Sequence, residues 1–166
     1  LAGRFSVPVT TSGAVVLVPE GSRLRALGSL DDARVRIAVN RGGHLERVTR
    51  AHFPRAEIIA ISNNQAVLGT LAQDRADAVV TDTLEAPHWE RQLPGVTRLG
   101  PFTRDTKAYL VGRNQGALAA DLDAWLLQRE ADQTLEGLRQ RSLGQSLAPP
   151  PAEPVAALLA AIDERL

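Results

Sequence analysis

The chain has 166 residues, of which 44% are hydrophobic and 23% are charged, and this average composition excludes the disordered and fibrous classes. Nineteen basic and nineteen acidic residues give a net charge of zero. This argues against a nucleic-acid or membrane-surface partner, because proteins that bind these anionic surfaces carry an excess of basic residues. No apolar run is long enough to insert across a bilayer. The chain has no cysteine and only three scattered histidines, so we expect neither a metal site nor another cofactor.

The first ninety residues alternate between predicted strands and predicted helices. Short apolar runs that end in turn residues predict strands, and wider apolar spacing predicts helices. The predicted strands are 14–18, 34–39, 57–61 and 77–81. The predicted helices are 46–53, 65–73 with Ser62 as its N-cap, and 82–91. This order predicts an α/β fold with a parallel sheet and crossover helices.

The rest of the chain is predicted to be mainly helical. A strand is expected at 107–111, and helix from Gly116 onward. A proline-rich linker at 148–154 and an amphipathic helix at 155–166 follow, and that helix either begins another domain or packs on the body. The helical region carries one apolar stripe, interpreted as a core face: Leu118, Leu122, Trp125, Leu126, Leu135, Leu138 and Leu143.

The first candidate site is the glycine turn that follows the strand at 34–39. Gly42, Gly43 and His44 come where a strand passes into a helix. In a parallel sheet, ligands bind at the carboxyl ends of the strands, where backbone N–H groups and the helix dipole favour a carboxylate or phosphate. A tight turn without a ligand is the alternative interpretation.

The second candidate site is an acidic pair after the strand at 77–81. Asp82 and Glu85 are three residues apart, so on a helix they share a face. Such a pair suits a substrate ammonium group, or one carboxyl group acts as a general acid. The alternative is structural, with Asp82 as the helix N-cap and Glu85 completing a capping box.

A single cation stands out in an arginine-rich sequence. Lys107 is the only lysine of the chain, which favours a functional role for its ammonium group, with a solvated surface lysine as the alternative. His52 and His88 have no metal-ligand spacing and are interpreted as surface or half-buried residues.

Several segments together resemble the second half of type II periplasmic solute-binding proteins. The segment FSVPV at 5–9 resembles that family's "FSxPY", 29–39 resembles "sL-DLkGkrVaV", and 74–82 resembles "GraDavvtD". Within this superfamily the chain is most similar to the cyclohexadienyl dehydratases, which are exported enzymes acting on prephenate and arogenate. The segments that carry this similarity are 39–43 for "VNpGG", 81–86 for "TDaiEa", and 101–102 with 107–110 for "PF…eKAYLl".

The resemblance, which runs from about residue 4 to residue 144, implies a two-lobed fold that lacks its N-terminal part and closes on a ligand between the lobes. It implies that Glu85 is the general acid, that Lys107 and the Gly42–Gly43 turn lie near substrate carboxylates, and that Asp82 sits where relatives hold an amino group. It also implies a periplasmic or secreted protein. The implied domains are the end of the first lobe with the hinge crossover (1–30), the second lobe (31–106), and the return crossover with C-terminal helices (107–147).

One departure from the pattern bears on function. The family's "GGTN" reads Gly42-Gly43-His44-Leu45, so two hydrogen-bond donors become an imidazole and an aliphatic group. A buried carboxylate that loses donors is destabilised by about 1–3 kcal/mol per bond. This favours the second hypothesis, a binding protein of an importer for an amino acid or small carboxylate. The third is a lobe with only an interaction role, or one completed by an oligomer or an additional chain.

The C-terminal tail resembles the first helix of helical chorismate mutases. The segment 155–166 ends in IDERL, similar to their "IDeRl", and Arg165 would then correspond to a substrate-binding arginine. An ordinary amphipathic helix is the alternative. Since chorismate mutase makes prephenate, the resemblance implies a fusion of consecutive reactions.

Overall fold

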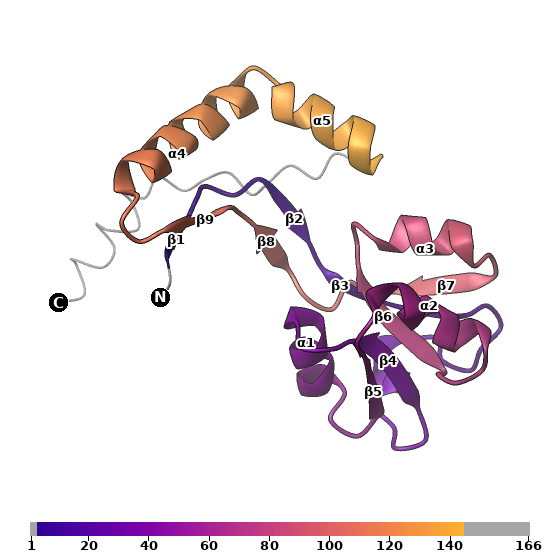
Figure 1. Cartoon of the computed structure of the whole chain (residues 1–166). Helices are drawn as coiled ribbons and strands as arrows, with labels where there is room; N and C mark the ends of the chain where they lie inside the picture. Colours follow the sequence, from indigo (N-terminus) through magenta and orange to yellow (C-terminus); the bar gives the residue numbers. More distant parts are fainter. Residues whose placement is uncertain (1–2, 145–166) are drawn as a thin grey trace. The chain divides into compact units, whose positions relative to one another are not determined.

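A computed structural model describes residues 3–144 of the chain. The predicted linker at 148–154 and the predicted helix at 155–166, with its chorismate mutase resemblance, lie outside the described residues. The chain forms two units (Figure 1). Unit 2 comprises Ser12–Asp105, and unit 1 comprises the described residues before and after it.

Unit 2 is built on a five-stranded mixed sheet. Three of its strands are parallel and confirm the predicted strand–helix alternation. Strand β3 (Ala14–Pro19) runs antiparallel to both of its neighbours, β6 (Ala78–Asp82) and β7 (Val96–Leu99), so the sheet as a whole is mixed. The sheet order is β5 (Glu57–Ile61), β4 (Arg36–Asn40), β6 (Ala78–Asp82), β3 (Ala14–Pro19) and β7 (Val96–Leu99).

Helices cover both faces of this sheet (Figure 1). One core lies between the sheet and the helices α2 (Asn64–Ala72) and α3 (Ala86–Gln92). The other lies on the side of α1 (His44–His52) and the short 3-10 helix η1 (Leu27–Leu30). Alternate residues of β3 enter the two cores, which explains why this strand is continuously apolar.

Helix starts differ from the predictions where side chains form local turns. Helix α1 begins at His44, two residues earlier than predicted. The N-cap of α2 is Asn63 and not Ser62, because the Asn63 carboxamide oxygen accepts the Gln65 N–H. Helix α3 begins at Ala86 and not at Asp82, because residues 83–85 form a turn.

Unit 1 contains short strands and two helices. Strands β1 (Gly3–Phe5) and β9 (Leu110–Gly112) pair with each other, as do β2 (Thr10–Ser12) and β8 (Asp105–Lys107), which are the segments where the chain passes between the units. Helices α4 (Gly116–Ala131) and α5 (Thr134–Leu143) follow.

The strand predicted at 107–111 is interrupted in the structure. It is divided between β8 and β9, since the Ser6 hydroxyl accepts the Tyr109 N–H in place of a backbone partner. The predicted domain boundary at residue 31 is also corrected. It lies at Ser12, because β3 pairs with two strands of unit 2.

The predicted apolar stripe of the helical region is only partly a core face. Leu126 and Leu135 are buried, and Leu122 and Leu143 are half-buried. The side chains of Leu118, Trp125 and Leu138 are exposed, so the interpretation of the whole stripe as core is wrong for these residues.

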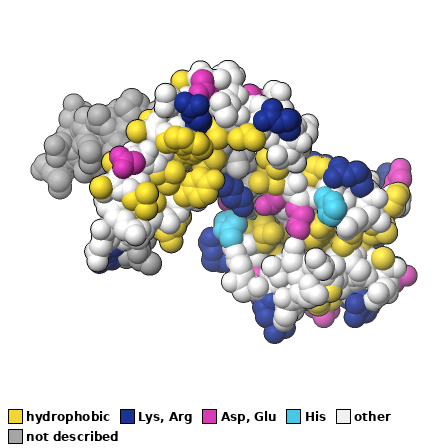
Figure 2. Space-filling view, turned by 45° about the horizontal axis from the view of Figure 1, so that its top comes forward, with side chains coloured by type: hydrophobic (Ala, Val, Ile, Leu, Met, Phe, Trp, Pro, Cys, Tyr) yellow, Lys and Arg dark blue, Asp and Glu magenta, His cyan; other side chains and the backbone are white. Residues whose placement is uncertain are grey.

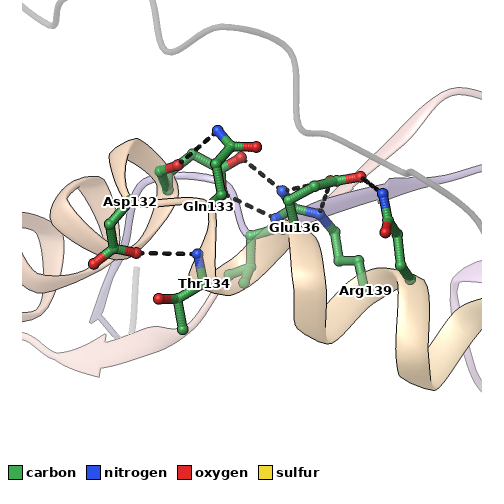
Figure 3. Close-up of polar contacts among 8 residues, drawn as sticks. Asp132, Gln133, Thr134, Glu136 and Arg139 are labelled. Carbon is green, nitrogen blue, oxygen red and sulfur yellow. Dashed lines mark hydrogen bonds and ion pairs between the residues drawn. The ribbon is translucent and has the colours of Figure 1, made fainter.

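A buried arginine joins the two helices of unit 1. Arg139 on α5 is 6% exposed, and its guanidinium donates to both carboxylate oxygens of Glu130 at 3.0 and 2.6 Å. It also donates to Glu136 and to the Val9 carbonyl. Figure 3 shows Arg139 and Glu136 with the turn residue Gln133, which lies between the helices. The Glu130 and Glu136 carboxylates outweigh the effect of burial and raise the pKa of Arg139.

Candidate functional site

The candidate site lies at the carboxyl edge of the unit 2 sheet. Strands β4, β5 and β6 are parallel, so the turns after Asn40, Ile61 and Asp82 meet at this edge. Strand β3 starts at the same edge, because Ala14 pairs with Asp82. The topology therefore brings the glycine turn and the acidic pair to one edge of one sheet, although they are some forty residues apart in sequence.

Glu85 is the best-defined carboxylate of this edge. Its side chain does not turn back to cap α3, so the predicted capping box does not form. Instead Oε1 accepts the Asn64 amide N–H at 2.8 Å, and Oε2 accepts the Thr81 hydroxyl at 2.5 Å. Asn64 starts α2 after β5, and Thr81 is a fully buried residue of β6. A residue at the start of α2 and a residue of β6 thus fix the orientation of the carboxylate.

The Thr81 contact has a chemical consequence. A hydroxyl group both donates and accepts a hydrogen bond, so Thr81 suits a deprotonated Glu85 and also one that carries a proton on Oε2. The Asn64 amide N–H only donates, and it therefore directs a proton away from Oε1.

Asp82 organises the turn that presents Glu85. Its Oδ1 accepts the backbone N–H groups of Leu84 at 2.9 Å and of Glu85 at 3.0 Å. Asp82 thus closes the turn at 83–85 and not the first turn of the helix, so the prediction of Asp82 as the N-cap of α3 is wrong: the N-cap position is Glu85. The expected shared helix face is wrong, because both residues precede α3.

The glycine turn is already occupied by a side chain of its own helix. The Gly42 N–H donates to Glu46 Oε2 at 2.7 Å, and Gly42 has a φ of 79°, which favours glycine. Glu46 also accepts two bonds from Arg50. The Gly42 N–H and, to a lesser degree, the Arg50 guanidinium lower the pKa of Glu46. A ligand carboxylate at Gly42 would compete with this internal carboxylate. A shallow depression here is lined by Gly42, Gly43, His44, Glu46, Arg47 and Arg50.

His44 is held by a series of hydrogen bonds within unit 2. Its Nε2 lies 2.8 Å from Asp105 Oδ1, and its Nδ1 lies 2.8 Å from the Arg47 guanidinium. Asp105 Oδ2 accepts the Thr103 hydroxyl, which in turn accepts the Ala14 N–H. Because a guanidinium only donates, this geometry requires the neutral ring with its proton on Nε2.

The other residues singled out from the sequence make contacts of their own elsewhere in the two units. Leu45, which replaces a donor of the family pattern, packs against the core on the α1 side. Lys107 is an exposed residue of β8 in unit 1, and its carbonyl accepts the Val9 N–H. His52 contacts the rings of Phe53 and Phe102, and His88 lies 2.9 Å from Gln92.

Sequence reasoning missed three residues of this edge: Asn64, Arg47 and Asp105. Asn64 had a usable signal, because the polar run 62–64 follows a strand directly and must lie at the same edge as Asp82. Asp105 had none, since its partner His44 is 61 residues away. Among residues 3–144 no group of three or more His, Asp or Glu side chains is arranged to hold a metal ion.

Comparison with known proteins connects this edge to a family. No protein-family profile matches the chain. The chain is 32% identical over 127 residues to a cyclohexadienyl dehydratase of Pseudomonas aeruginosa. The aligned region covers 74% of this chain and 47% of that protein. A structure of an ancestral cationic amino acid solute-binding protein matches with a TM-score of 0.71 and 26% identity over 86% of this chain and 62% of that one. The chain has the fold of the type II periplasmic solute-binding proteins.

The solute-binding fold is shared here by proteins of two kinds. An ancestral cyclohexadienyl dehydratase matches with a TM-score of 0.52 and 28% identity, over 87% of this chain and 62% of that one. The chain spans about half the length of the curated relative that it matches.

In the described part of the chain, no helix combines the length and apolar character needed to cross a membrane.

Proposed function

We propose that this chain is part of a cyclohexadienyl dehydratase-like enzyme in which Glu85 is the general acid. The observation that carries the proposal is the Glu85 carboxylate, held by Asn64 and Thr81 at the carboxyl edge of the sheet. The similarity in sequence to a cyclohexadienyl dehydratase supports it. A carboxylate used only to cap α3 would not need two donors from outside that helix, one from α2 and one from β6.

The proposed reaction is a dehydration coupled to loss of carbon dioxide. Glu85 donates its proton to the departing ring hydroxyl, which leaves as water. The ring carboxylate leaves as carbon dioxide, and the electron pair of the broken carbon–carbon bond completes the aromatic ring. Thr81 keeps a hydrogen bond to Glu85 before and after proton transfer, because its hydroxyl group both donates and accepts.

The resemblance assigns the substrate carboxylates to Lys107 and the Gly42–Gly43 turn, and to these we add Arg47. Arg47 and His44 line the depression beside Gly43 in unit 2. The role of Lys107, a residue of unit 1, rests on the resemblance alone. The ligand is thus a small carboxylate, and periplasmic or secreted localisation follows from the same resemblance. No cofactor has a role in this proposal.

The test is the turnover of prephenate by the parent and by Glu85→Gln. We expect phenylpyruvate formation to fall by about 10²–10⁴-fold in Glu85→Gln, because the amide has no proton to donate at this position. Ligand binding, measured by calorimetry, should persist. The test uses the full-length protein, in which the parent is expected to turn over prephenate, and equal turnover by Glu85→Gln would show that the assigned role of Glu85 is wrong.

An alternative function is the binding of an amino acid without chemistry. It is favoured by the loss of donors at His44 and Leu45. One matched structure is an ancestral cationic amino acid solute-binding protein. Calorimetry with lysine, arginine and prephenate separates the two functions. Tight binding of an amino acid without turnover of prephenate would decide for a binding protein.

A further inference from the structure

The glycine turn carries a titratable ring where the family pattern has a neutral donor. His44 replaces the threonine of "GGTN". Its side chain is 42% exposed and lines the depression at the start of α1 together with Gly42, Gly43, Glu46, Arg47 and Arg50. On the face of the molecule shown in Figure 2, histidine side chains lie among basic and acidic ones. Imidazole is the side chain that changes its charge near neutral pH, so this position can respond to a proton.

Opposite charges lie on the two sides of the His44 ring, all within unit 2. Nε2 donates to the Asp105 carboxylate of β8, and the Asp105 side chain is only 17% exposed. Thr103 donates to the other carboxylate oxygen and holds the group in place. The Arg47 guanidinium lies against Nδ1. The carboxylate favours a protonated ring and the guanidinium opposes one, so the protonation of the ring depends on whether the Arg47 charge is neutralised.

The other charged groups near the ring have partners of their own. Glu46 accepts hydrogen bonds from the Gly42 N–H and from the Arg50 guanidinium. Arg41, which belongs to the same turn, donates to the Ala60 carbonyl and does not line the depression. Within the depression, a ligand anion is therefore left with Arg47 as its cationic partner.

The charges around the ring balance when no ligand is bound. With the neutral ring, the two cations Arg47 and Arg50 match the two carboxylates Glu46 and Asp105. A ligand carboxylate adds one negative charge, and an unbalanced charge in a partly buried site is unfavourable. One proton on His44 restores the balance and turns Nδ1 from an acceptor into a donor. Arg47 then no longer bonds to the ring, so the ring and the guanidinium can donate to the same carboxylate.

We propose that a ligand carboxylate binds between His44 and Arg47 and that its binding takes up one proton at His44. The Nδ1–H of His44 and the Arg47 guanidinium donate to the ligand, while Asp105 stays on Nε2 and balances the imidazolium. The inference rests on the proposed function only in taking a small carboxylate as the ligand, and it is the same for an amino acid of the alternative function. The replacement of the family's hydroxyl donor thus makes ligand binding depend on pH.

The experiment is calorimetry of the full-length protein with two probes, phenylpyruvate and free arginine. Phenylpyruvate is the product of the proposed reaction and is not turned over, whereas arginine represents the alternative function. Titrations near pH 8 in HEPES and in Tris, which differ in their heats of ionisation, give the number of protons taken up with the probe. We expect about one proton per bound carboxylate. Above the ordinary titration range of imidazole, the affinity should fall by about tenfold for each pH unit.

His44→Gln is the decisive variant. Its carboxamide both donates and accepts, as the neutral ring does, but it does not take up a proton. The proton uptake should disappear, and the affinity should no longer change with pH. His88→Gln is the matched control, because His88 lies beside Gln92 and does not line the depression, and it should keep the proton uptake of the parent. The difference between parent and His44→Gln also removes any proton exchanged by the probe's own groups.

Asp105→Asn tests the charge balance. Without this carboxylate the Arg47 charge is unbalanced in the free protein, so a ligand carboxylate neutralises it without a proton. We expect binding near pH 8 to be retained and its proton uptake to fall close to zero. A residue that only supported the fold would change the affinity and leave the number of protons unchanged.

Nitrogen NMR of the histidine rings identifies the group that takes up the proton. Near pH 8, saturating probe should convert the His44 signals from the Nε2–H form to the doubly protonated form, with His88 unchanged. Binding without proton uptake, or uptake that persists in His44→Gln, would overturn the proposal. So would the failure of both probes to bind at millimolar concentration. If the proton uptake is found while Glu85→Gln turns over prephenate as the parent does, only the catalytic role of Glu85 fails.

Discussion

His44 Nε2 and Asp105 Oδ1 lie 2.8 Å apart at the edge of the unit 2 sheet, although 61 residues separate them in the chain. On the other side of the ring, the Arg47 guanidinium lies within hydrogen-bond distance of Nδ1. The imidazole is therefore not a simple replacement for the hydroxyl group of the family pattern. It connects the start of α1 to β8, the strand that leaves unit 2.

This relationship predicts a defined tautomer of His44. Near pH 8, above the ordinary titration range of imidazole, nitrogen NMR should show the proton on Nε2. His88 is the internal comparison, because the Gln92 amide N–H lies against its Nε2 and favours the proton on Nδ1. In Asp105→Ala, the His44 signal should become a mixture of tautomers while His88 is unchanged. A predominant Nδ1–H form of His44 in the parent would contradict the described contacts.

Asn64 should matter to catalysis, while its neighbour Asn63 should matter only to stability. Asn64→Ala removes one of the two donors to Glu85, so we expect turnover of prephenate to fall by about tenfold or more, with little change in the free energy of unfolding. Asn63→Ala removes the N-cap of α2 and should lower the free energy of unfolding by about 1 kcal/mol with activity retained. Equal effects of the two variants on turnover would rule out a special role for Asn64.

The stability of unit 2 should depend on pH through Asp77. This carboxylate accepts hydrogen bonds from the Arg36 guanidinium and from the Arg36 backbone N–H. The bond from the guanidinium contributes most to lowering the pKa of Asp77 in the folded protein. A lowered folded pKa means that the stabilisation is complete above the unfolded pKa of about 4 and is lost as the pH falls through the folded value.

Chemical unfolding between pH 7 and pH 2 tests this dependence. Asp77→Asn should be less stable than the parent at neutral pH, and the difference should shrink in acid. Asp74→Asn, an exposed residue of the preceding turn, is the control and should follow the parent. A constant difference between Asp77→Asn and the parent across the whole range would refute the linkage.

The Arg139 cluster should stabilise the contact between α4 and α5. Arg139→Met leaves the Glu130 and Glu136 carboxylates without their shared cation, and we expect a loss of about 2–3 kcal/mol in the free energy of unfolding of unit 1. Urea unfolding followed through Trp125, which lies on α4, measures this loss. Arg141→Met, on the exposed side of the same helix, should cost little. Similar losses in both variants would place the stabilisation outside the cluster.

The amino-acid sequence by itself determined the order and type of the main elements. The strand at 57–61 agrees with β5 residue for residue, because a short apolar run, here 58–61, between a proline turn and polar residues favours a strand. The glycine turn and the TDTLEA segment were recognisable because local backbone geometry and a family resemblance both depend on short segments. Element boundaries were less accurate where a side chain forms a local bond, as Asn63 and Asp82 do.

Only the tertiary structure decided which side chains contact each other and which helix faces remain exposed to solvent. Neither the Asn64–Glu85 bond nor the Asp105–His44 bond follows from spacing, because each joins different elements through the sheet order. Apolar periodicity predicts that a face of α4 will be buried, but only if a partner is available to cover it. Leu118 and Trp125 have the same spacing as the buried Ala119 and Leu126, and they are exposed because unit 1 covers one stripe of the helix and leaves the next to solvent.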